Sequence, residues 1–186
     1  TASSVLNDIA SLRKAIDNAG HDALFMVDCI ASLGCDRFEM DDWGVDVMVA
    51  ACQKGLMTPA GLSFVFFNDR GAAARKSAHP SFYWDWSLRA NSEVFYQKFA
   101  GTAPTHHLYG LREALDMLVH EEGMEQAWGR HTTIARAIWA ALEVWGAKGA
   151  MHHNIKDPGK RSTAVSAIST IPEAAGQIRS WCEFRA

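Results

Sequence analysis

The sequence lacks the features that mark membrane-spanning, secreted and nucleic-acid-binding proteins. No apolar run is long enough to cross a bilayer, and the start, Thr1–Ser4, has neither the basic residues nor the apolar stretch of a signal peptide. No block of Lys and Arg stands out in a composition with a formal net charge of −3, so nucleic acid is not the expected partner. We therefore expect a cytoplasmic protein without a membrane or nucleic-acid partner.

Cysteine is also scarce, and its spacing is uninformative for metal binding. The four cysteines are Cys29, Cys35, Cys52 and Cys182. Their separations match no zinc-ligand pattern, and three of them lie in apolar runs, which favours buried, reduced thiols. The adjacent pairs His106–His107 and His152–His153 are poor chelators, because neighbouring residues on a helix point apart. The sequence therefore predicts no metal site.

What the chain does contain is typical of an α/β protein. Its 186 residues, 48% of them apolar, suffice for one good core, or for one domain and part of another. Predicted helices and strands alternate with short loops, which indicates a mostly parallel sheet with flanking helices. The expected helices cover residues 4–19, 68–78, 105–123, 124–145 and 172–181, and the expected strands cover 24–27, 45–50, 63–67 and 162–171. Residues 79–96 are expected to be irregular.

Lys54 is the most informative residue. The apolar stretch that ends at Cys52 leads to this lysine, and a loop of small residues then runs into the second apolar strand, Ser63–Phe67. We expect so much buried sequence to desolvate the amine, lower its pKa and free it as a nucleophile. That is the requirement for a Schiff-base lysine. The alternative is a surface lysine at a strand end.

Asp28 completes the interpretation. The apolar stretch Leu24–Val27 ends on this carboxylate, and ligands of open α/β sheets collect at the carboxyl ends of strands. Pyridoxal phosphate needs a lysine to hold its aldehyde and an acid to keep its pyridine nitrogen protonated. Asp28 and Lys54 would supply both groups at one sheet edge. The alternative for Asp28 is a helix N-cap.

Several ordered motifs resemble the class V aminotransferases of fold type I. They are Val27–Gly34, Gln53–Gly55, Pro59–Leu62 and Gly101–Leu115. The sequence is similar to the alanine/serine–glyoxylate branch of that family, and Tyr83–Trp86 resembles bacterial members that include aspartate–glyoxylate enzymes. The resemblance covers nearly the whole chain.

This resemblance implies a transaminase that moves an amino group from a small amino acid to glyoxylate through a Schiff base on Lys54. Serine, alanine and aspartate all remain open as the amino donor. After the substrate's amine displaces it, Lys54 would also move the proton between the substrate's Cα and the cofactor's C4′ as general base and acid. Asp28 would pair with the pyridinium nitrogen of pyridoxal 5′-phosphate.

The resemblance assigns three further contacts to the cofactor. Ile30 would pack on one face of the ring, Gln53 would bond near the phenolic oxygen or the phosphate, and Thr102 would reach the phosphate held by the partner subunit of a homodimer. Plain core packing for Ile30 and a polar strand end for Gln53 are the alternatives. Many relatives carry a tyrosine where this chain has Phe99, and Thr1 matches a family Ser/Thr that touches the cofactor.

The same resemblance implies that the chain is an internal fragment. Residues 1–123 would form the C-terminal part of the cofactor-binding large domain, and residues 124–186 would begin the small C-terminal domain. The phosphate loop and the arginine for the substrate carboxylate are expected outside the chain, so the isolated piece is expected to be inactive. In the family, one strand of the sheet runs antiparallel to the others.

Two other functions stay open. One is a different class V chemistry on the same scaffold, of the lyase or desulfurase type. A desulfurase is expected to carry a His before its lysine and a catalytic Cys on a later loop, whereas Gln53 precedes Lys54 here. The other is a non-catalytic fragment or paralogue that uses the fold for assembly. The Asp28 and Lys54 pair favours an intact site.

Overall fold

The computed structural model describes the backbone of residues 2–185 and the side chains of residues 2–180. The chain divides into two compact units. Asp8–Met124 form the first, which we call the sheet unit, and the N-terminal residues as far as Asn7 join the chain from Glu125 onward in the second, the C-terminal unit. Their assignment to a cofactor domain and a small domain stays a prediction.

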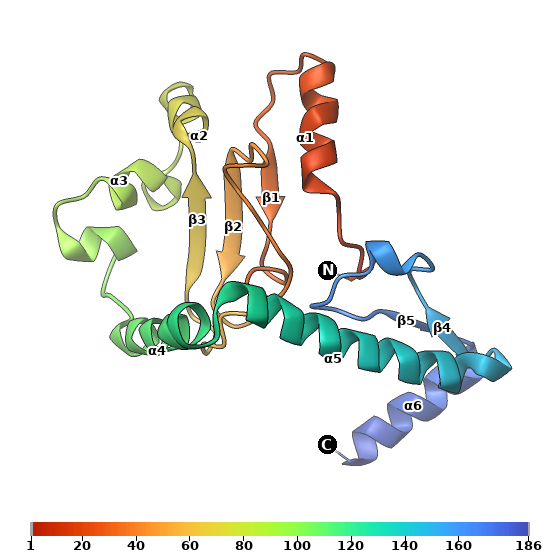
Figure 1. Cartoon of the computed structure of the whole chain (residues 1–186). Coiled ribbons are helices and arrows are strands. Elements are labelled where there is room, and N and C mark those ends of the chain that lie inside the picture. Colours follow the sequence, from red (N-terminus) through yellow and green to blue (C-terminus); the bar gives the residue numbers. More distant parts are fainter. Residues whose placement is uncertain (1, 186) are drawn as a thin grey trace. The chain divides into compact units, whose positions relative to one another are not determined.

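The sheet unit is built on three strands in the order β1-β2-β3 (Figure 1). β1 (Met26–Asp28) runs parallel to β2 (Val47–Ala51), and β3 (Ser63–Phe67) runs antiparallel to β2. This mixed sheet with flanking helices confirms the predicted α/β class, including the antiparallel strand that the family resemblance implied.

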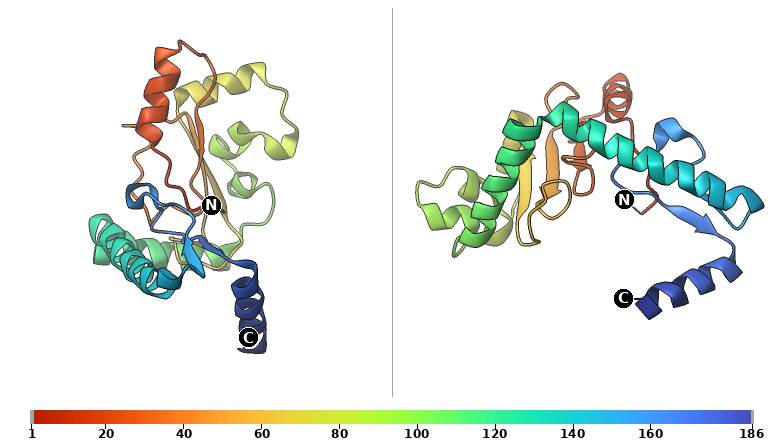
Figure 2. Two further views of the ribbon diagram at one scale, coloured as in Figure 1. Left: turned by 90° about the vertical axis from the view of Figure 1, so that its right-hand side faces the viewer. Right: turned by 60° about the horizontal axis from the view of Figure 1, so that its bottom comes forward.

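The central strand β2 is covered on both faces, as its apolar sequence requires. On one face Met48 and Ala50 belong to the buried core against which Ile9 of α1 (Ile9–Asn18) packs. On the other face, Gly71 of α2 (Asp69–Ala74) lies so close to Val47 and Phe67 that an added Cβ would be 3.3 and 3.2 Å from their side chains. The edge-on view shows α1 and α2 on opposite sides of the sheet (Figure 2).

Helix boundaries in the sheet unit differ from the prediction where a side chain caps the helix. α1 begins at Ile9 rather than residue 4, because Asp8 is its N-cap and accepts a hydrogen bond from the Ser11 amide at 2.9 Å. Asn68 caps α2 in the same way, accepting from the Gly71 amide at 2.9 Å. The remaining helical elements are the 3₁₀ turns Arg75–Ser77, Phe82–Trp84 and Phe95–Phe99, the short α3 (Trp86–Ala90), and α4 (Thr105–Leu115), which continues as a π-helical turn over Asp116–Glu122. The segment expected to be irregular therefore contains short helices.

The C-terminal unit consists mainly of a long helix and a small hairpin. α5 (Met124–Trp145) has the predicted bounds. β4 (Met151–His153) and β5 (Ile168–Thr170) pair antiparallel, with 3₁₀ turns at Gly146–Lys148 and Pro158–Lys160, and α6 (Pro172–Arg185) follows. The prediction of a strand over residues 162–171 was wrong for most of its length, because its partner β4 has only three residues to pair. No described helix is long and apolar enough to cross a membrane.

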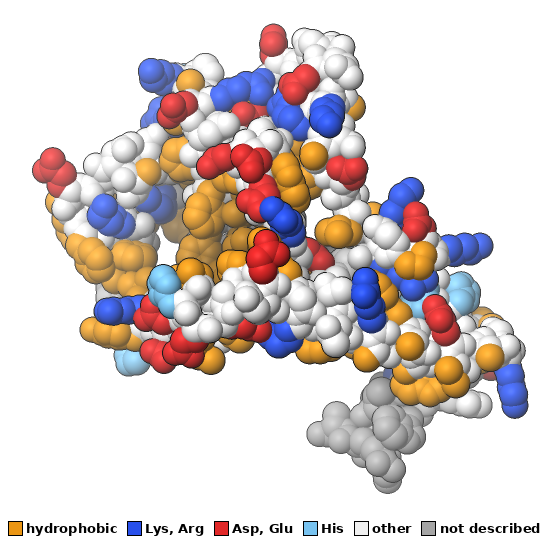
Figure 3. Space-filling model, in the orientation of Figure 1, with side chains coloured by type: hydrophobic (Ala, Val, Ile, Leu, Met, Phe, Trp, Pro, Cys, Tyr) orange, Lys and Arg blue, Asp and Glu red, His pale blue; other side chains and the backbone are white. Residues whose placement is uncertain are grey.

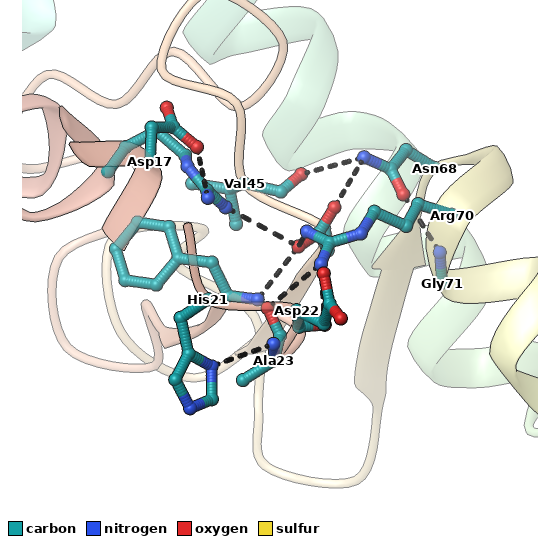
Figure 4. Close-up of polar contacts among 11 residues, drawn as sticks. Asp17, His21, Asp22, Ala23, Val45, Asn68, Arg70 and Gly71 are labelled. Atoms are coloured by element: carbon teal, nitrogen blue, oxygen red, sulfur yellow. Dashed lines mark hydrogen bonds and ion pairs between the residues drawn. The ribbon is translucent and has the colours of Figure 1, made fainter. Parts of the chain in front are cut away.

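A buried carboxylate ties the elements together at the amino ends of β1 and β2. Asp46 is 3% exposed. Its Oδ2 accepts hydrogen bonds from the Phe25 amide at 2.7 Å and from Arg70 Nη1 at 2.9 Å, and its Oδ1 accepts one from Asn68 Nδ2 at 3.1 Å. Arg70 Nη2 in turn donates to the carbonyl of Asp22 at 2.6 Å. Figure 4 shows the side chains of Asn68 and Arg70 in this network, with dashed lines for its hydrogen bonds. Sequence reasoning missed this network because its members are distant along the chain.

Replacing Asp46 tests how much this network contributes to the stability of the chain. Asp46→Ala leaves the Phe25 amide and Arg70 Nη1 without their acceptor, so we expect a loss of about 3 kcal/mol in the free energy of unfolding. Urea denaturation of the chain measures it. Asp42→Ala, at an exposed position, is the control and is expected to stay within about 0.5 kcal/mol of the unsubstituted chain. Equal stabilities for the two variants would contradict the assignment.

Candidate active site

Asp28 and Lys54 lie at the same edge of the sheet. Asp28 is the last residue of β1 and pairs in register with Val49 of β2. Lys54 follows shortly after Ala51, where β2 ends. Because β1 and β2 are parallel, the loops that follow them leave the sheet at one edge, where ligands of α/β proteins bind. In Figure 1, α4 lies beside this edge.

The two loops touch through their glycines. A Cβ added to Gly55 would lie 2.2 Å from the Leu33 carbonyl oxygen and 2.9 Å from Cys35 Sγ, and one added to Gly34 would lie 3.1 Å from the carbonyl carbon of Gly55. Gly34 also has a φ of +85°, which L side chains rarely adopt. The backbone of the Asp28 loop is therefore in direct contact with the residue after Lys54, and no larger residue fits at Gly55 without moving one of the loops.

Cys52 organises the loop that carries Lys54. Its amide donates to the Leu62 carbonyl at 3.2 Å and its thiol donates to the Pro59 carbonyl at 3.1 Å, so both arms of the loop between β2 and β3 are joined at its base. The Thr58 amide donates back to the Cys52 carbonyl at 3.1 Å. Within this frame the Met57 amide donates to the carbonyl of Lys54 at 3.0 Å. The backbone of Lys54 is therefore held in a turn while its side chain remains exposed.

The exposure of Lys54 corrects one expectation. The flanking strand residues Ala51 and Cys52 are buried, but the Lys54 side chain itself is not, so the described residues do not supply the predicted desolvation. The reason is that the apolar residues around it are directed into the core of the sheet unit, whereas the lysine lies on the loop beyond them. Among the described residues, no carboxylate forms an ion pair with its amine.

One carboxylate oxygen of Asp28 accepts a hydrogen bond from a neighbouring amide, and the other is available to a ligand. Its Oδ1 accepts a hydrogen bond from the Ile30 amide at 2.8 Å, within the turn that follows β1. No described group donates to Oδ2, and the carboxylate is exposed. The neighbouring Cys29 is 1% exposed, and burial raises the pKa of its thiol to about 11. Asp28 is therefore the group at the end of β1 that can meet a cation.

Helix α4 is joined to the Lys54 loop at its first turn. His107 Nε2 lies 3.0 Å from the Ala60 carbonyl oxygen. A Cβ on Gly61 would come within 2.5 Å of the same imidazole nitrogen, and Gly61 has a φ of +154°. Thr102, which is exposed, lies in the segment just before Pro104, the N-cap of this helix. The contact brings the start of α4 to the loop that carries Lys54.

The other predicted site residues lie on these same loops. Gln53 is exposed beside Lys54, and Ile30 is half-buried after β1. Thr1 lies outside the described residues. Sequence reasoning missed the Gly34–Gly55 contact, the Cys52 bonds and the His107 contact. Each glycine is the last residue of its motif and could have signalled a close approach, whereas nothing in the sequence pairs His107 with a carbonyl so distant along the chain.

Known proteins resemble the chain over most of its length. The sequence model of the family described as Aminotransferase class-V matches residues 1–170. A serine–glyoxylate aminotransferase of Methylorubrum extorquens is 39% identical over 175 residues, which is 90% of this chain and 42% of that protein. An L-aspartate–glyoxylate aminotransferase of Paracoccus denitrificans is 37% identical, over 93% of this chain and 42% of that protein. The chain thus spans less than half the length of these relatives.

Solved structures give the fold independently. The crystal structure of an alanine–glyoxylate aminotransferase from Nostoc sp. matches with a TM-score of 0.80, over 95% of this chain and 46% of that one. Its sequence identity is 24%, so this likeness shows the fold alone.

The glycine contact can be tested by adding the missing Cβ. In Gly55→Ala the new carbon meets the Leu33 carbonyl, so the two loops must separate, and we expect a loss of about 2 kcal/mol in the free energy of unfolding. Hydrogen exchange should also become faster at the amides of residues 29–35. Gly129→Ala is the control, since nothing lies within 4 Å of a Cβ at that helical position. Unchanged exchange in the Gly55 variant would contradict the contact.

Proposed function

The chain belongs to the class-V aminotransferase family, and on that premise we propose that the protein containing it transfers an amino group from a small amino acid to glyoxylate with pyridoxal 5′-phosphate as its cofactor. One observation carries the proposal: the loops of Asp28 and Lys54 touch at Gly34 and Gly55, at the carboxyl ends of parallel strands. The relatives named for serine–glyoxylate and aspartate–glyoxylate transfer support glyoxylate as the acceptor and serine or aspartate as the amino donor. A relative named for alanine–glyoxylate transfer supports alanine as a third donor.

The residues present fit this cofactor. The Lys54 amine is exposed on a fixed backbone turn and can bond the aldehyde carbon. Asp28 keeps Oδ1 on the Ile30 amide, which orients the carboxylate, and can accept a hydrogen bond from a protonated ring nitrogen with Oδ2. When bound, pyridoxal phosphate supplies an electron sink for the bonds at the substrate's Cα.

The proton transfers fall to the side chains of this chain. With its amine free, Lys54 Nζ would take the proton from the substrate's Cα as general base and would deliver it, as general acid, to the cofactor's C4′. The turn closed by the Met57 amide limits where that amine can reach. The negative charge of Asp28 would keep a proton on the ring nitrogen, because a nearby opposite charge favours the protonated form.

The second candidate, a desulfurase-type reaction, receives no support from the described cysteines. Cys29, Cys35 and Cys52 are all buried and form no disulfide. Gln53 occupies the position before the lysine. Buried cysteines without disulfides instead agree with a reducing compartment, and we propose a cytoplasmic enzyme.

We also propose that the enzyme is a homodimer whose cofactor sites use residues of both subunits. Ile30 would cover one face of the ring and Gln53 would bond near the phenolic oxygen or phosphate of its own subunit's cofactor. Thr102, exposed before α4, would donate to the phosphate held by the partner. The sheet unit would then be part of the cofactor domain, and the C-terminal unit would begin the small domain.

Reductive labelling tests the role of Lys54. Protein incubated with pyridoxal phosphate and treated with borohydride should carry the label on Lys54, because that amine alone would be bonded to the aldehyde carbon. Peptide mapping by mass spectrometry locates the label. Lys54→Ala should abolish specific labelling, whereas Lys98→Ala, at another exposed lysine, should leave it unchanged. Specific label on a different lysine would refute the assignment.

Asp28→Asn separates the electronic role from binding. Without the negative charge the ring nitrogen loses its proton, so removal of the substrate's Cα proton should slow by about 10²-fold or more. Cofactor affinity should fall much less. Exchange of the Cα proton into deuterated water measures the first quantity, and equilibrium titration with pyridoxal phosphate measures the second. Asp41→Asn, at an exposed site, is the control; a normal exchange rate in the Asp28 variant would reject the role.

Mixed dimers test the position of Thr102. Thr102→Val should weaken cofactor binding by about tenfold, the effect of one lost hydrogen bond to a charged group. In a dimer of one Thr102→Val subunit and one Lys54→Ala subunit, the intact Lys54 faces an intact Thr102 on the partner. Normal affinity should therefore return at that site. Affinity that stays low in the mixed dimer would place Thr102 on its own subunit's cofactor.

A further inference from the structure

The C-terminal unit has an open cavity of about 460 Å³ that is lined by His152, His153, Lys156 and Arg161. β4 contributes both histidines, and the segment between β4 and β5 contributes the other two. Two of the four lining residues, Lys156 and Arg161, carry a positive charge, and the other two are histidines, whose ring nitrogens can form hydrogen bonds. In Figure 3, Lys/Arg and His side chains lie next to one another on this unit. Such a lining favours an anionic ligand.

Arg161 differs from an ordinary surface arginine, because its side chain is buried at this cavity. It is 8% exposed. Its Nε donates to the Ile155 carbonyl at 2.8 Å, its Nη2 donates to the Lys156 carbonyl at 3.1 Å, and its Cζ lies 5.3 Å from the centroid of the Trp139 ring. These partners fix the guanidinium in place but carry no net negative charge. Among the described residues, no carboxylate forms an ion pair with it.

A buried charge without a counter-ion is unfavourable, and the nearest acid in sequence does not relieve it. The Asp157 carboxylate accepts a hydrogen bond from the Gly159 amide at 2.9 Å and caps its own turn. The Arg161 charge is thus held rigidly at a cavity wall and left without a neutralising partner.

His153 provides a second, independent sign of a missing ligand. Its ring meets Trp139 edge to face, with 6.4 Å between centroids. Its Nε2 is buried and has no hydrogen-bond partner within the described part of the chain. Buried polar atoms are nearly always paired, and each exception calls for an explanation. An acceptor oxygen within the cavity would satisfy this nitrogen and offset the Arg161 charge together.

We propose that this cavity binds a compact, doubly charged oxyanion of the size of phosphate, either free phosphate or the phosphate group of a monoester. Arg161 and His153 form the fixed wall of the site. The exposed His152 and Lys156 complete it from the solvent side and add charge-assisted hydrogen bonds. The proposal concerns the C-terminal unit alone and does not depend on the transaminase reaction.

The direct test follows two side chains by NMR. The chain is titrated with inorganic phosphate at pH 7 and constant ionic strength, with acetate and a small phosphate monoester such as glycerol phosphate as parallel arms. We expect saturable shifts of the His153 ring and the Arg161 guanidinium resonances, with phosphate binding at least about tenfold more tightly than acetate. A monoester that binds more tightly than phosphate would identify an esterified ligand, and the reverse order would identify the free ion. Resonances that do not saturate, or acetate that binds as well as phosphate, would overturn the proposal.

Variants then locate the site. Lys156→Gln combined with His152→Gln removes the two exposed groups without touching Arg161, and should weaken phosphate binding by about tenfold or more. Lys148→Gln is the matched control, because it removes an exposed lysine of the same unit that does not line the cavity. Circular dichroism confirms that each variant is folded, and if the double variant does not fold, the titration of the unsubstituted chain decides. Equal weakening in the control would show nonspecific attraction and refute the site.

Discussion

The close approach of two loops at Gly34 and Gly55 is the contact on which the candidate active site depends. The parallel pairing of β1 and β2 places the Asp28 and Lys54 loops at one edge, but pairing alone leaves the loops free to diverge. With a Cβ position only 2.2 Å from the Leu33 carbonyl oxygen, Gly55 can sit against the other loop solely because it has no side chain. That backbone contact turns two separate strand ends into one site.

Charged side chains have opposite environments at the two ends of the sheet. At the amino end, Asp46 is buried and accepts hydrogen bonds from Phe25, Asn68 and Arg70, and these bonds stabilise the fold. At the carboxyl end, Asp28 and Lys54 are exposed. One carboxylate oxygen of Asp28 accepts a hydrogen bond, and Lys54 accepts one through its backbone carbonyl. A satisfied carboxylate stabilises, whereas an oriented and partly unsatisfied one can bind. This contrast separates the structural acid from the candidate catalytic one.

The sequence predicted what depends on local pattern. The strand over residues 63–67 and the helix over residues 124–145 have the expected bounds, because the first is a continuous apolar run and the second keeps its helical periodicity to the end. The strand expected over residues 162–171 shrank to Ile168–Thr170, since the length of a strand depends on its partner and β4 was not predicted. The buried sequence around Lys54 was recognised, yet the lysine is exposed, because burial of neighbours in a strand does not extend to the loop beyond it. The family resemblance supplied the antiparallel β3, which no local pattern distinguishes.

The most direct test of the account is a crystal structure of the protein containing this chain with pyridoxal 5′-phosphate bound. The account predicts a covalent bond from Lys54 Nζ to the cofactor's aldehyde carbon. It also predicts one Asp28 oxygen within about 2.8 Å of the ring nitrogen, with the backbones of Gly34 and Gly55 still in contact. A cofactor bound elsewhere, or one whose ring nitrogen faces a group other than Asp28, would contradict it.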